Sequence, residues 1–208
     1  MENKNNDIPD IIVARLPRYL RALNVLREKG NTTNSQELGN FLGFSAAQIR
    51  KDLSQFGEFG KQGTGYNIDF LSHQIESILN IDNDWKMILV GCGNIGHAIL
   101  NYSGFSNNGF HIVAAVDSNP DVIGKTINQK ITIQDINNIE QILKSEDILI
   151  AMLTVPAIEA QKTAEKLVEY GIKGILSYAP ILLNLPDDIQ VEYIDPVLSL
   201  QHITYYLK

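Results

Sequence analysis

A glycine pattern at residues 91–96 narrows the possible folds more than any other part of the sequence. It reads Gly-Cys-Gly-Asn-Ile-Gly, follows the apolar run 86–90 and precedes the helical segment 97–100. A strand, a loop of this form and a helix in succession are typical of the turn that holds the pyrophosphate of a dinucleotide. The first glycine permits the tight turn, the second lets the backbone approach the phosphates, and the third lets helix and strand pack closely. The predicted cofactor contacts in this loop are Gly91, Cys92, Gly93, Asn94, Ile95 and Gly96.

The rest of the C-terminal two-thirds alternates apolar runs with helical segments. Apolar runs at 111–117, 131–133, 147–153 and 174–178 follow the glycine loop, and the helical stretch 157–170 separates the last two. This alternation predicts an α/β fold, a parallel, doubly wound sheet of the Rossmann type, whose ligand crevice lies beyond the strand ends. The loops at those ends predict further cofactor contacts from Thr154, Tyr178, Ala179 and Pro180.

Asp117 indicates which dinucleotide the crevice takes. It closes the run 111–117 and lies 21 residues beyond Gly96. A carboxylate near this position binds the hydroxyls of the adenosine ribose, and it repels a 2′-phosphate. No arginine occurs after Arg50 to offset that repulsion. The sequence therefore predicts NAD(H) rather than NADP(H); an ordinary acid at a strand end is the alternative.

The composition excludes several other classes of protein. The single cysteine, Cys92, rules out an intramolecular disulfide and a cysteine-rich zinc site, and its place between two glycines predicts a buried packing residue rather than a redox-sensing thiol. The four histidines lack the spacing of a metal site or a catalytic triad, so we expect no metal. No apolar run approaches the roughly 20 residues that span a bilayer, and the polar N-terminus does not read as a signal peptide. We expect a soluble, cytoplasmic protein.

Charge is distributed unevenly along the chain. Residues 81–208 account for the whole net charge of -7, whereas residues 1–80 are neutral and the segment 11–61 carries an excess of four basic side chains. A basic segment joined to an acidic remainder indicates that only the first part meets a polyanion. A solvated basic face is the alternative.

The N-terminal third predicts a helix-turn-helix. Apolar residues recur at helical spacing over 11–29, where Pro17 opens a helix after a short preceding one. A second helix is capped by Thr33 or Asn34, and a third, from Ala46 to about Phe56, follows a capping box of Ser45 and Gln48. The third shows small and basic side chains outward, which suits a helix lying in the major groove. There, Arg and Lys reach guanine or phosphates and Gln addresses adenine. The predicted DNA contacts are Ser45, Ala47, Gln48, Arg50, Lys51 and Ser54.

The segment behind this helix predicts the wing of a winged-helix domain. Four glycines within residues 57–65 favour a tight hairpin over 57–68, with Lys61 at its tip as a phosphate contact. A further helix over 72–81 leads into a linker. We expect a DNA-binding domain at 1–80, a dinucleotide-binding domain at 81–192 and a C-terminal helix at 193–208. Apolar residues surround that last helix on nearly every side, so we expect it to pack against a partner.

Several segments, in order along the chain, are similar to the redox-sensing transcriptional repressors of the Rex family. They are residues 14–21 (Ala-Arg-Leu-Pro-Arg-Tyr-Leu-Arg), 48–54 (Gln-Ile-Arg-Lys-Asp-Leu-Ser), 56–60 (Phe-Gly-Glu-Phe-Gly), 90–98 with Asn101 and Tyr102, 153–156 and 171–176. The resemblance implies a homodimer of winged-helix and Rossmann subunits that exchange their C-terminal helices. It implies binding to palindromic operator DNA when NAD is bound or the site is free, and release by NADH. By position, Arg21, Tyr102 and Asp195 match the family's polar residues that rearrange near the nicotinamide.

Two other functions compete with a repressor. One is an NAD-dependent oxidoreductase with an N-terminal DNA-binding extension. The chain after residue 91 completes the nucleotide fold without a substrate domain, and Tyr102, Tyr178 and the histidines form no recognisable acid–base arrangement. The other is a constitutive architectural protein, which predicts a DNA affinity indifferent to NADH. We therefore expect a regulator, not an enzyme.

Overall fold

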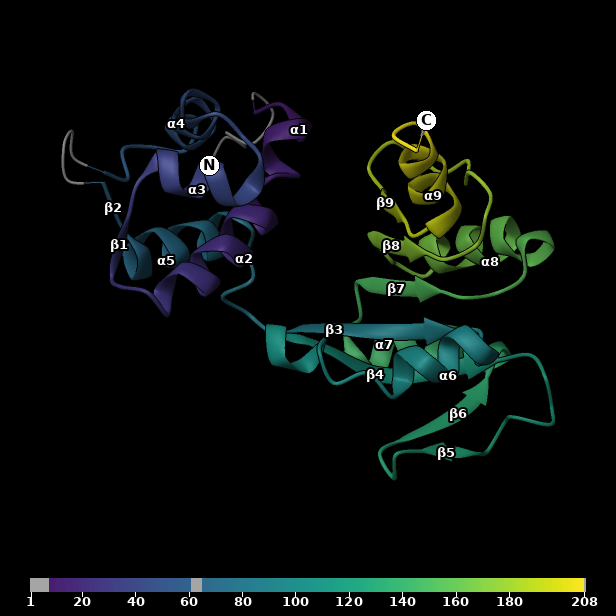
Figure 1. Ribbon diagram of the computed structural model, residues 1–208. Helices are drawn as coiled ribbons and strands as arrows, with labels where there is room; N and C mark the ends of the chain where they lie inside the picture. Colours follow the sequence, from purple (N-terminus) through teal and green to yellow (C-terminus); the bar gives the residue numbers. More distant parts are fainter. Residues whose placement is uncertain (1–7, 61–64, 208) are drawn as a thin grey trace. The chain divides into compact units, whose positions relative to one another are not determined.

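The computed structural model describes residues 8–60 and 65–207 (Figure 1). The chain divides into two compact units, with the boundary between Asn83 and Asp84. The expected boundary lay three residues earlier, inside the same polar linker.

The first unit is a small helical domain. Its helices are α1 (Asp10–Val13), α2 (Leu16–Arg27), α3 (Ser35–Leu42), α4 (Ala46–Ser54) and α5 (Ile68–Ile78). Pro17 lies in the first turn of α2, as predicted. Asn34 caps α3 through its side chain, and Gly43 ends that helix in the left-handed region at φ 74°. These signals fix a tight turn between α3 and α4, so the predicted helix-turn-helix is confirmed. Its core contains Leu16, Leu23, Leu38, Ile49, Leu53, Leu71 and Ile75.

The predicted hairpin over 57–68 lies partly outside the described residues, and its described ends are close together, with Gly60 beside Gly65 and Tyr66. The strand β2 (Tyr66–Asn67) pairs antiparallel with β1 (Thr32–Thr33), ahead of α3, and residues 57–60 form no strand. The physical reason is that Phe59 turns into the helical core instead of taking part in a ladder. The helix after the wing also begins earlier than predicted, at Ile68, because the side chain of Asn67 accepts a hydrogen bond from the backbone N–H of Phe70. The predicted contact Lys61 lies outside the described residues.

The second unit contains the predicted doubly wound sheet. In the described chain, its seven strands run in the order β5-β6-β4-β3-β7-β8-β9, and all neighbours are parallel except β5 and β6. The strands are β3 (Trp85–Val90), β4 (Phe110–Asp117), β5 (Thr126–Ile127), β6 (Ile131–Asp135), β7 (Ile150–Leu153), β8 (Gly174–Ser177) and β9 (Gln190–Tyr193). Apart from β5, this is the strand order of the Rossmann fold. The chain first adds strands on one side of β3 and then, from β7 onward, adds them on the other side.

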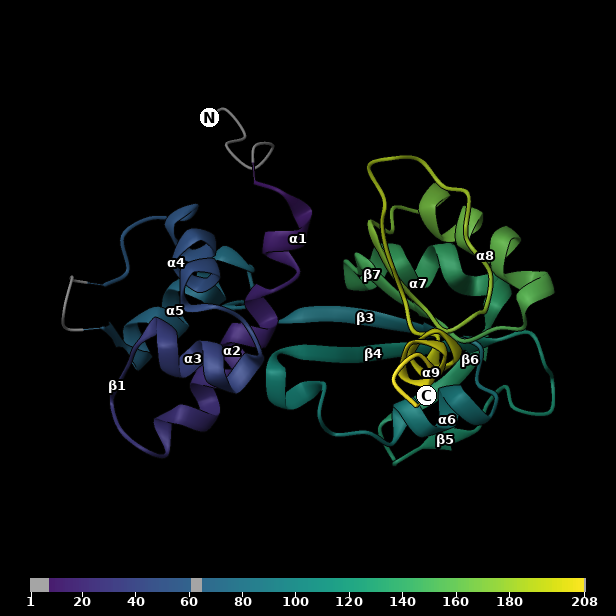
Figure 2. The same ribbon diagram turned by 45° about the horizontal axis from the view of Figure 1, so that its top comes forward.

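Helices cover both faces of the sheet (Figure 2). The remaining helices of this unit are α6 (Asn94–Leu100), the 3-10 turns η2 (Ser106–Asn108) and η3 (Ile136–Asn138), α7 (Ile139–Glu146), α8 (Ala157–Glu169) and α9 (Pro196–Thr204). Along β3, Met87 and Leu89 pack with α6, whereas Ile88 and Val90 pack with α7 and α8. This alternation is the period of a strand buried on both faces.

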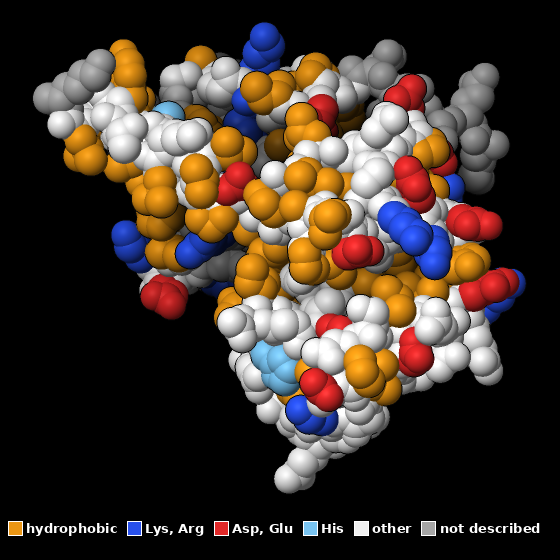
Figure 3. All heavy atoms as spheres, turned by 90° about the vertical axis from the view of Figure 1, so that its right-hand side faces the viewer, with side chains coloured by type: hydrophobic (Ala, Val, Ile, Leu, Met, Phe, Trp, Pro, Cys, Tyr) orange, Lys and Arg blue, Asp and Glu red, His pale blue; other side chains and the backbone are white. Residues whose placement is uncertain are grey.

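Helix α9 carries an uncovered apolar surface. Asp195 caps it by accepting a hydrogen bond from the backbone N–H of Val197, and Pro196 occupies its first turn. None of its residues is buried in the described chain. Hydrophobic side chains are visible on the face shown in Figure 3, and the exposed large ones from α9 onward are Val197, Leu198, Leu200, Ile203, Tyr205, Tyr206 and Leu207.

Candidate functional site

A crevice of about 750 Å³ opens beyond the carboxyl ends of the central strands. This is the place where open α/β sheets bind ligands, at the point where the strand order reverses. Most of the predicted cofactor contacts line it: Gly91, Gly93, Asn94, Ile95, Asp117, Thr154, Tyr178 and Pro180. Three predicted residues do not line it. Cys92 and Ala179 are buried beside it, and Gly96 is buried under the loop.

The three glycines of the loop lie in different surroundings. Gly91 has φ +97°, and a Cβ there would lie 2.8 Å from the backbone of Thr154. A Cβ at Gly96 would collide with the carbonyl oxygen of Gly91, so helix and strand approach closely only because no side chain intervenes. Gly93 differs from both: its φ is -74°, and a Cβ would meet nothing within 4 Å. The protein itself therefore gives no reason for a glycine at 93.

Asp117 and Thr154 hold the glycine loop in place from the neighbouring strands. The Asp117 carboxylate accepts hydrogen bonds from the backbone N–H of Cys92 at 2.5 Å and of Asn119 at 2.7 Å. The Thr154 hydroxyl donates to the carbonyl of Gly91 at 2.5 Å. The loop is thus shaped before any ligand arrives, which lowers the entropy lost on binding.

Cys92 is a packing residue in this structure. Its side chain is buried, and its Sγ lies 3.7 Å from the carbonyl oxygen of Val116. Burial, with a smaller contribution from the Asp117 carboxylate, raises the pKa of the Cys92 thiol to about 12. Because the thiolate is the reactive form, this environment is opposite to that of a redox-sensing cysteine.

The crevice is also lined by residues that were not predicted from the sequence. Ser118, Asn119 and Ile136 follow two of the strands, and α8 contributes Glu159, Lys162, Thr163 and Lys166. Ser118, Asn119 and Ile136 lie just after the end of a strand, as Thr154 does, so the same reasoning could have predicted them. The residues of α8 could not be predicted in this way, since the side of a helix that faces a crevice depends on how the helix packs.

The outward face of α4 follows the prediction closely. Ala47, Arg50, Lys51 and Ser54 are exposed, whereas Ile49 and Leu53 are buried. The Arg50 guanidinium donates a hydrogen bond to the Ser35 hydroxyl at the start of α3, at 2.9 Å. Ser45 caps α4 by accepting from the backbone N–H of Gln48 at 3.1 Å. The other half of the predicted capping box is wrong, because the Gln48 side chain turns instead toward Asp52.

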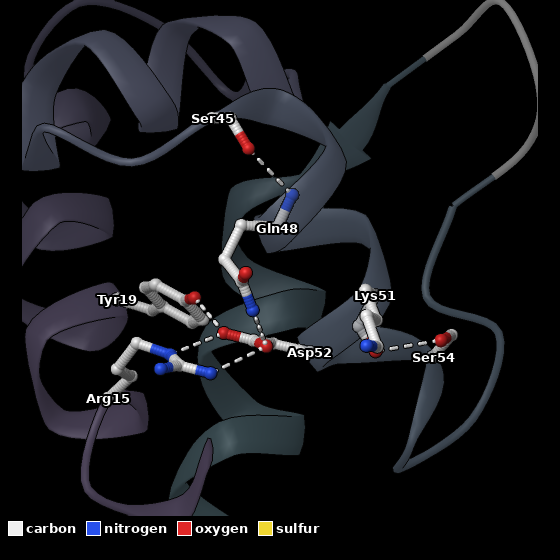
Figure 4. Close-up of polar contacts among 7 residues, drawn as sticks. All are labelled: Arg15, Tyr19, Ser45, Gln48, Lys51, Asp52 and Ser54. Atoms are coloured by element: carbon white, nitrogen blue, oxygen red, sulfur yellow. Dashed lines mark hydrogen bonds and ion pairs between the residues drawn. The ribbon is translucent and has the colours of Figure 1, made fainter. Parts of the chain in front are cut away.

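The sequence patterns did not predict a role for Asp52 in this helix. It is fully buried, and four donors from three residues surround its carboxylate (Figure 4). Arg15 donates from Nε at 2.6 Å and from Nη2 at 2.8 Å, and the amide of Gln48 donates at 2.6 Å. The Tyr19 hydroxyl donates as well. Arg15 and Tyr19 come from the start of α2, so the cluster ties α4 to α2.

The contacts within the Asp52 cluster shift the pKa values of its ionisable members. Burial alone raises the pKa of Asp52, but the hydrogen bonds from Arg15, Tyr19 and Gln48 outweigh it and hold that pKa below its usual value. The hydrogen bond to Asp52 also raises the pKa of Arg15, and burial together with Asp52 raises the pKa of Tyr19. The carboxylate is therefore ionised, paired and fully hydrogen-bonded, the condition under which a buried charge is tolerated.

The three residues matched to the nicotinamide switch belong to two different units. Tyr102 and Asp195 belong to the second unit, and neither is among the residues that line its crevice. Tyr102 follows α6 and is 62% exposed, Asp195 caps α9, and Arg21 is an exposed residue of α2 in the first unit. Their switching role stays a prediction.

Comparisons with known proteins agree with this division of the chain. Residues 82–181 match the family described as CoA binding domain, and residues 7–54 match that of a putative DNA-binding protein N-terminus. The redox-sensing transcriptional repressor Rex of Chloroflexus aggregans is 47% identical over 98% of this chain and 96% of its own length. The Rex of Clostridium botulinum strain Alaska E43 is 44% identical over 99% and 98%.

Solved structures are similar over almost the same length. RSP, a Rex-family repressor, in complex with β-NAD+ and operator DNA superimposes with a TM-score of 0.91 at 37% identity, covering 98% of this chain and 94% of that one. The same protein in complex with β-NADH gives a TM-score of 0.88 at 35% identity, covering 98% and 95%.

A helix-turn-helix unit joined to a Rossmann unit with a dinucleotide-type crevice defines a nucleotide-responsive transcriptional regulator. The relatives place this chain more closely: it belongs to the Rex family of redox-sensing transcriptional repressors. The expectation of a regulator rather than a dehydrogenase is thereby confirmed.

Within residues 8–60 and 65–207, none of the helices combines the length and apolarity needed to cross a membrane. The same residues contain no group of three or more His, Cys, Asp or Glu side chains placed to hold a metal ion.

Proposed function

We propose that this protein binds palindromic operator DNA as a homodimer in the cytoplasm and leaves it when NADH replaces NAD in the crevice. The observation that carries the proposal is Gly93, the one glycine of the loop whose Cβ would project into open space. A position kept free of a side chain, at the first turn of a helix and facing a crevice, suits the close approach of a pyrophosphate.

The crevice residues fit the dinucleotide. Gly91, Gly93 and Asn94 would lie along the pyrophosphate, Asp117 would bind the adenosine ribose, and Tyr178 and Pro180 line the same crevice. When bound, the nicotinamide supplies a ring that is planar and cationic when oxidised but neutral and puckered when reduced. Arg21, Tyr102 and Asp195 are the residues we propose to respond to that difference.

The exposed face of α4 is the proposed reading surface. Arg50 and Lys51 are the cations that would reach base edges and phosphates, with Ser45, Ala47 and Ser54 beside them. We propose that Gln48 helps to hold α4 in place rather than contacting a base, because its side-chain amide donates a hydrogen bond to Asp52. Two such helices in a dimer must lie about 34–36 Å apart, or a multiple of it, to read successive major grooves. The proposed effect of NADH is to change that separation.

Helix α9 is the proposed dimer contact. Its apolar side chains remain exposed in the described residues of a single chain, and a second copy would cover them. Exchange of this helix between subunits would also carry a change near Asp195 into the partner. Sedimentation of the purified protein should give the mass of a dimer.

The direct test of the proposed function is a gel shift on a library of palindromic operators, titrated separately with NAD and with NADH. We expect a retained complex with NAD and release with NADH. Equal retention with both would support the architectural alternative, and turnover of NADH with a hydroxy or keto acid would support the dehydrogenase.

Lys51→Ala should weaken DNA binding equally across sequences and lower the slope of log affinity against log salt by about one, as for a phosphate contact. Arg50→Ala should instead relax base preference at one position, at a cost of about 1–3 kcal/mol for the preferred base. Lys29→Ala, which removes an exposed cation outside α4, is the matched control. Unchanged affinity and salt slope in both α4 variants would contradict the assignment of the reading surface.

Asp117→Ala should weaken NAD and NADH by a similar factor, about tenfold (1.4 kcal/mol) for each. The reason is that the ribose contact is shared by both redox states, whereas the switch residues are not part of it. Calorimetric titration of each nucleotide measures the two factors. An unchanged NADH affinity would show that Asp117 does not contact the bound nucleotide.

A further inference from the structure

The ring of Tyr102 lies directly over the backbone of Gly104. A Cβ added at Gly104 would collide with the Cζ, hydroxyl oxygen and Cε1 atoms of that ring. The ring also meets Phe105 edge to face, with centroids 5.1 Å apart and an interplanar angle of 84°. Although Tyr102 is mostly exposed to solvent, it is held by a seat made of Gly104 and Phe105.

The backbone around Gly104 is held more firmly than the side chain of Tyr102. The Asn108 side chain donates to the carbonyl of Gly104 at 2.7 Å, and the Ser106 hydroxyl donates to the carbonyl of Ser103 at 3.0 Å. Phe105 packs against the core beneath the sheet. Tyr102, by contrast, is 62% exposed, so its ring can be displaced without disturbing the core.

The backbone conformation at position 104 does not require a glycine. Its φ lies outside the left-handed range, so an alanine fits the backbone there. A methyl group at this position would therefore be accommodated by moving the ring of Tyr102, not by moving the turn. Because the clash is with the far end of a flexible side chain, the free energy of unfolding should change little.

We propose that Gly104 is a positioning residue of the redox switch. Because it has no side chain, the Tyr102 ring can occupy the position from which the tyrosine responds to the nicotinamide. This inference rests on the proposed function, since it takes Tyr102 as a switch residue. Gly104 acts through the tyrosine and is not among the residues that line the dinucleotide crevice. Its replacement should uncouple NADH binding from DNA release while leaving both binding sites in place.

The experiment measures operator affinity of the full-length protein with and without saturating NADH. Gly104→Ala should reduce the ratio of the two affinities by about fivefold or more, toward one. Operator affinity without NADH and NADH affinity without DNA should both stay close to wild type. In fluorotyrosine NMR, the Tyr102 signal, assigned with Tyr102→Phe, should shift because the ring leaves Phe105.

Gly174→Ala is the matched control. It makes the same change in β8 of the same unit, where the new Cβ meets only Ile150 at an ordinary 3.7 Å. It should leave the affinity ratio and the Tyr102 signal unchanged.

A double variant shows whether Gly104 acts through Tyr102. Tyr102→Ala alone should lose NADH-induced release, and adding Gly104→Ala should then change nothing further, the non-additivity expected of a shared pathway. If Tyr102→Ala still releases DNA normally, the proposed switch role of Tyr102 fails, and this inference with it. If Tyr102→Ala loses release but Gly104→Ala keeps it, the inference alone is overturned. A large fall in Tm for Gly104→Ala, meaning that the turn moved, also overturns it.

Discussion

Asp52→Ala is expected to lower the free energy of unfolding by about 3–5 kcal/mol, the usual loss when one partner of a buried ion pair is removed. Arg15 would keep its charge without the carboxylate that now accepts two of its hydrogen bonds. The same change frees α4 from α2, so operator affinity should fall more than tenfold, with or without nucleotide. Denaturation and gel shifts on the full-length protein measure the two effects.

Asp69→Ala is the matched control for Asp52. Asp69 also pairs with an arginine of α2, Arg27, at 2.9 Å, but both side chains are largely exposed. Exposed pairs of this kind are worth about 0.2–1 kcal/mol, so this variant should remain close to wild type. Equal losses in the two variants would contradict the anchoring role of Asp52.

The pH dependence of stability gives an independent check on Asp52. Its donors hold its pKa below the usual value, so its contribution is complete above about pH 4, the pKa of an unperturbed aspartate. The contribution is lost as pH falls through the lower pKa of the folded state. The difference in unfolding free energy between wild type and Asp52→Asn should therefore shrink below pH 4. A constant difference over that range would show that the charge is not responsible.

Gly93→Ala is expected to weaken NAD and NADH at least about tenfold, a loss of about 1.4 kcal/mol, with only a small fall in Tm. The new Cβ meets nothing in the protein, so the only cost to the fold is the poorer N-cap that alanine makes for α6. The Cβ nevertheless occupies the space through which the pyrophosphate must approach. Calorimetry with each nucleotide and a thermal melt without nucleotide measure the two quantities.

Gly96→Ala separates this effect from general damage to the loop. Its Cβ would strike the carbonyl of Gly91, so both Tm and nucleotide affinity should fall together. Wild-type affinity in Gly93→Ala would mean that the dinucleotide does not pass over this position, and a fall in Tm as large as that of Gly96→Ala would mean that the glycine has a structural role.

The sequence predicted the Rossmann unit well because its signals are local. A strand, a glycine loop and a helix follow one another within residues 85–100, and the strand-end rule then placed Asp117, Thr154 and Tyr178 at the crevice. The caps Asn34 and Ser45 likewise act within three residues of themselves, so the limits of α3 and α4 were within reach.

What was missed depends on contacts between distant residues. Asp52 occupies the position three residues after Ile49, on the buried stripe of α4, yet its partners Arg15 and Tyr19 lie more than 30 residues earlier. An acid on an apolar stripe was the available signal. The pairing of β2 with β1 was missed for the same reason, because no local pattern showed that Phe59 would turn into the core.

NADH affinity measured with and without saturating operator DNA tests the central proposal most directly. A ligand shifts an equilibrium only by its differential affinity for the two states, and the coupling between two sites is reciprocal. We predict that operator DNA weakens NADH binding by the same factor by which NADH weakens operator binding, while NAD shows little change. An NADH affinity that is the same in the presence and absence of operator would contradict the account.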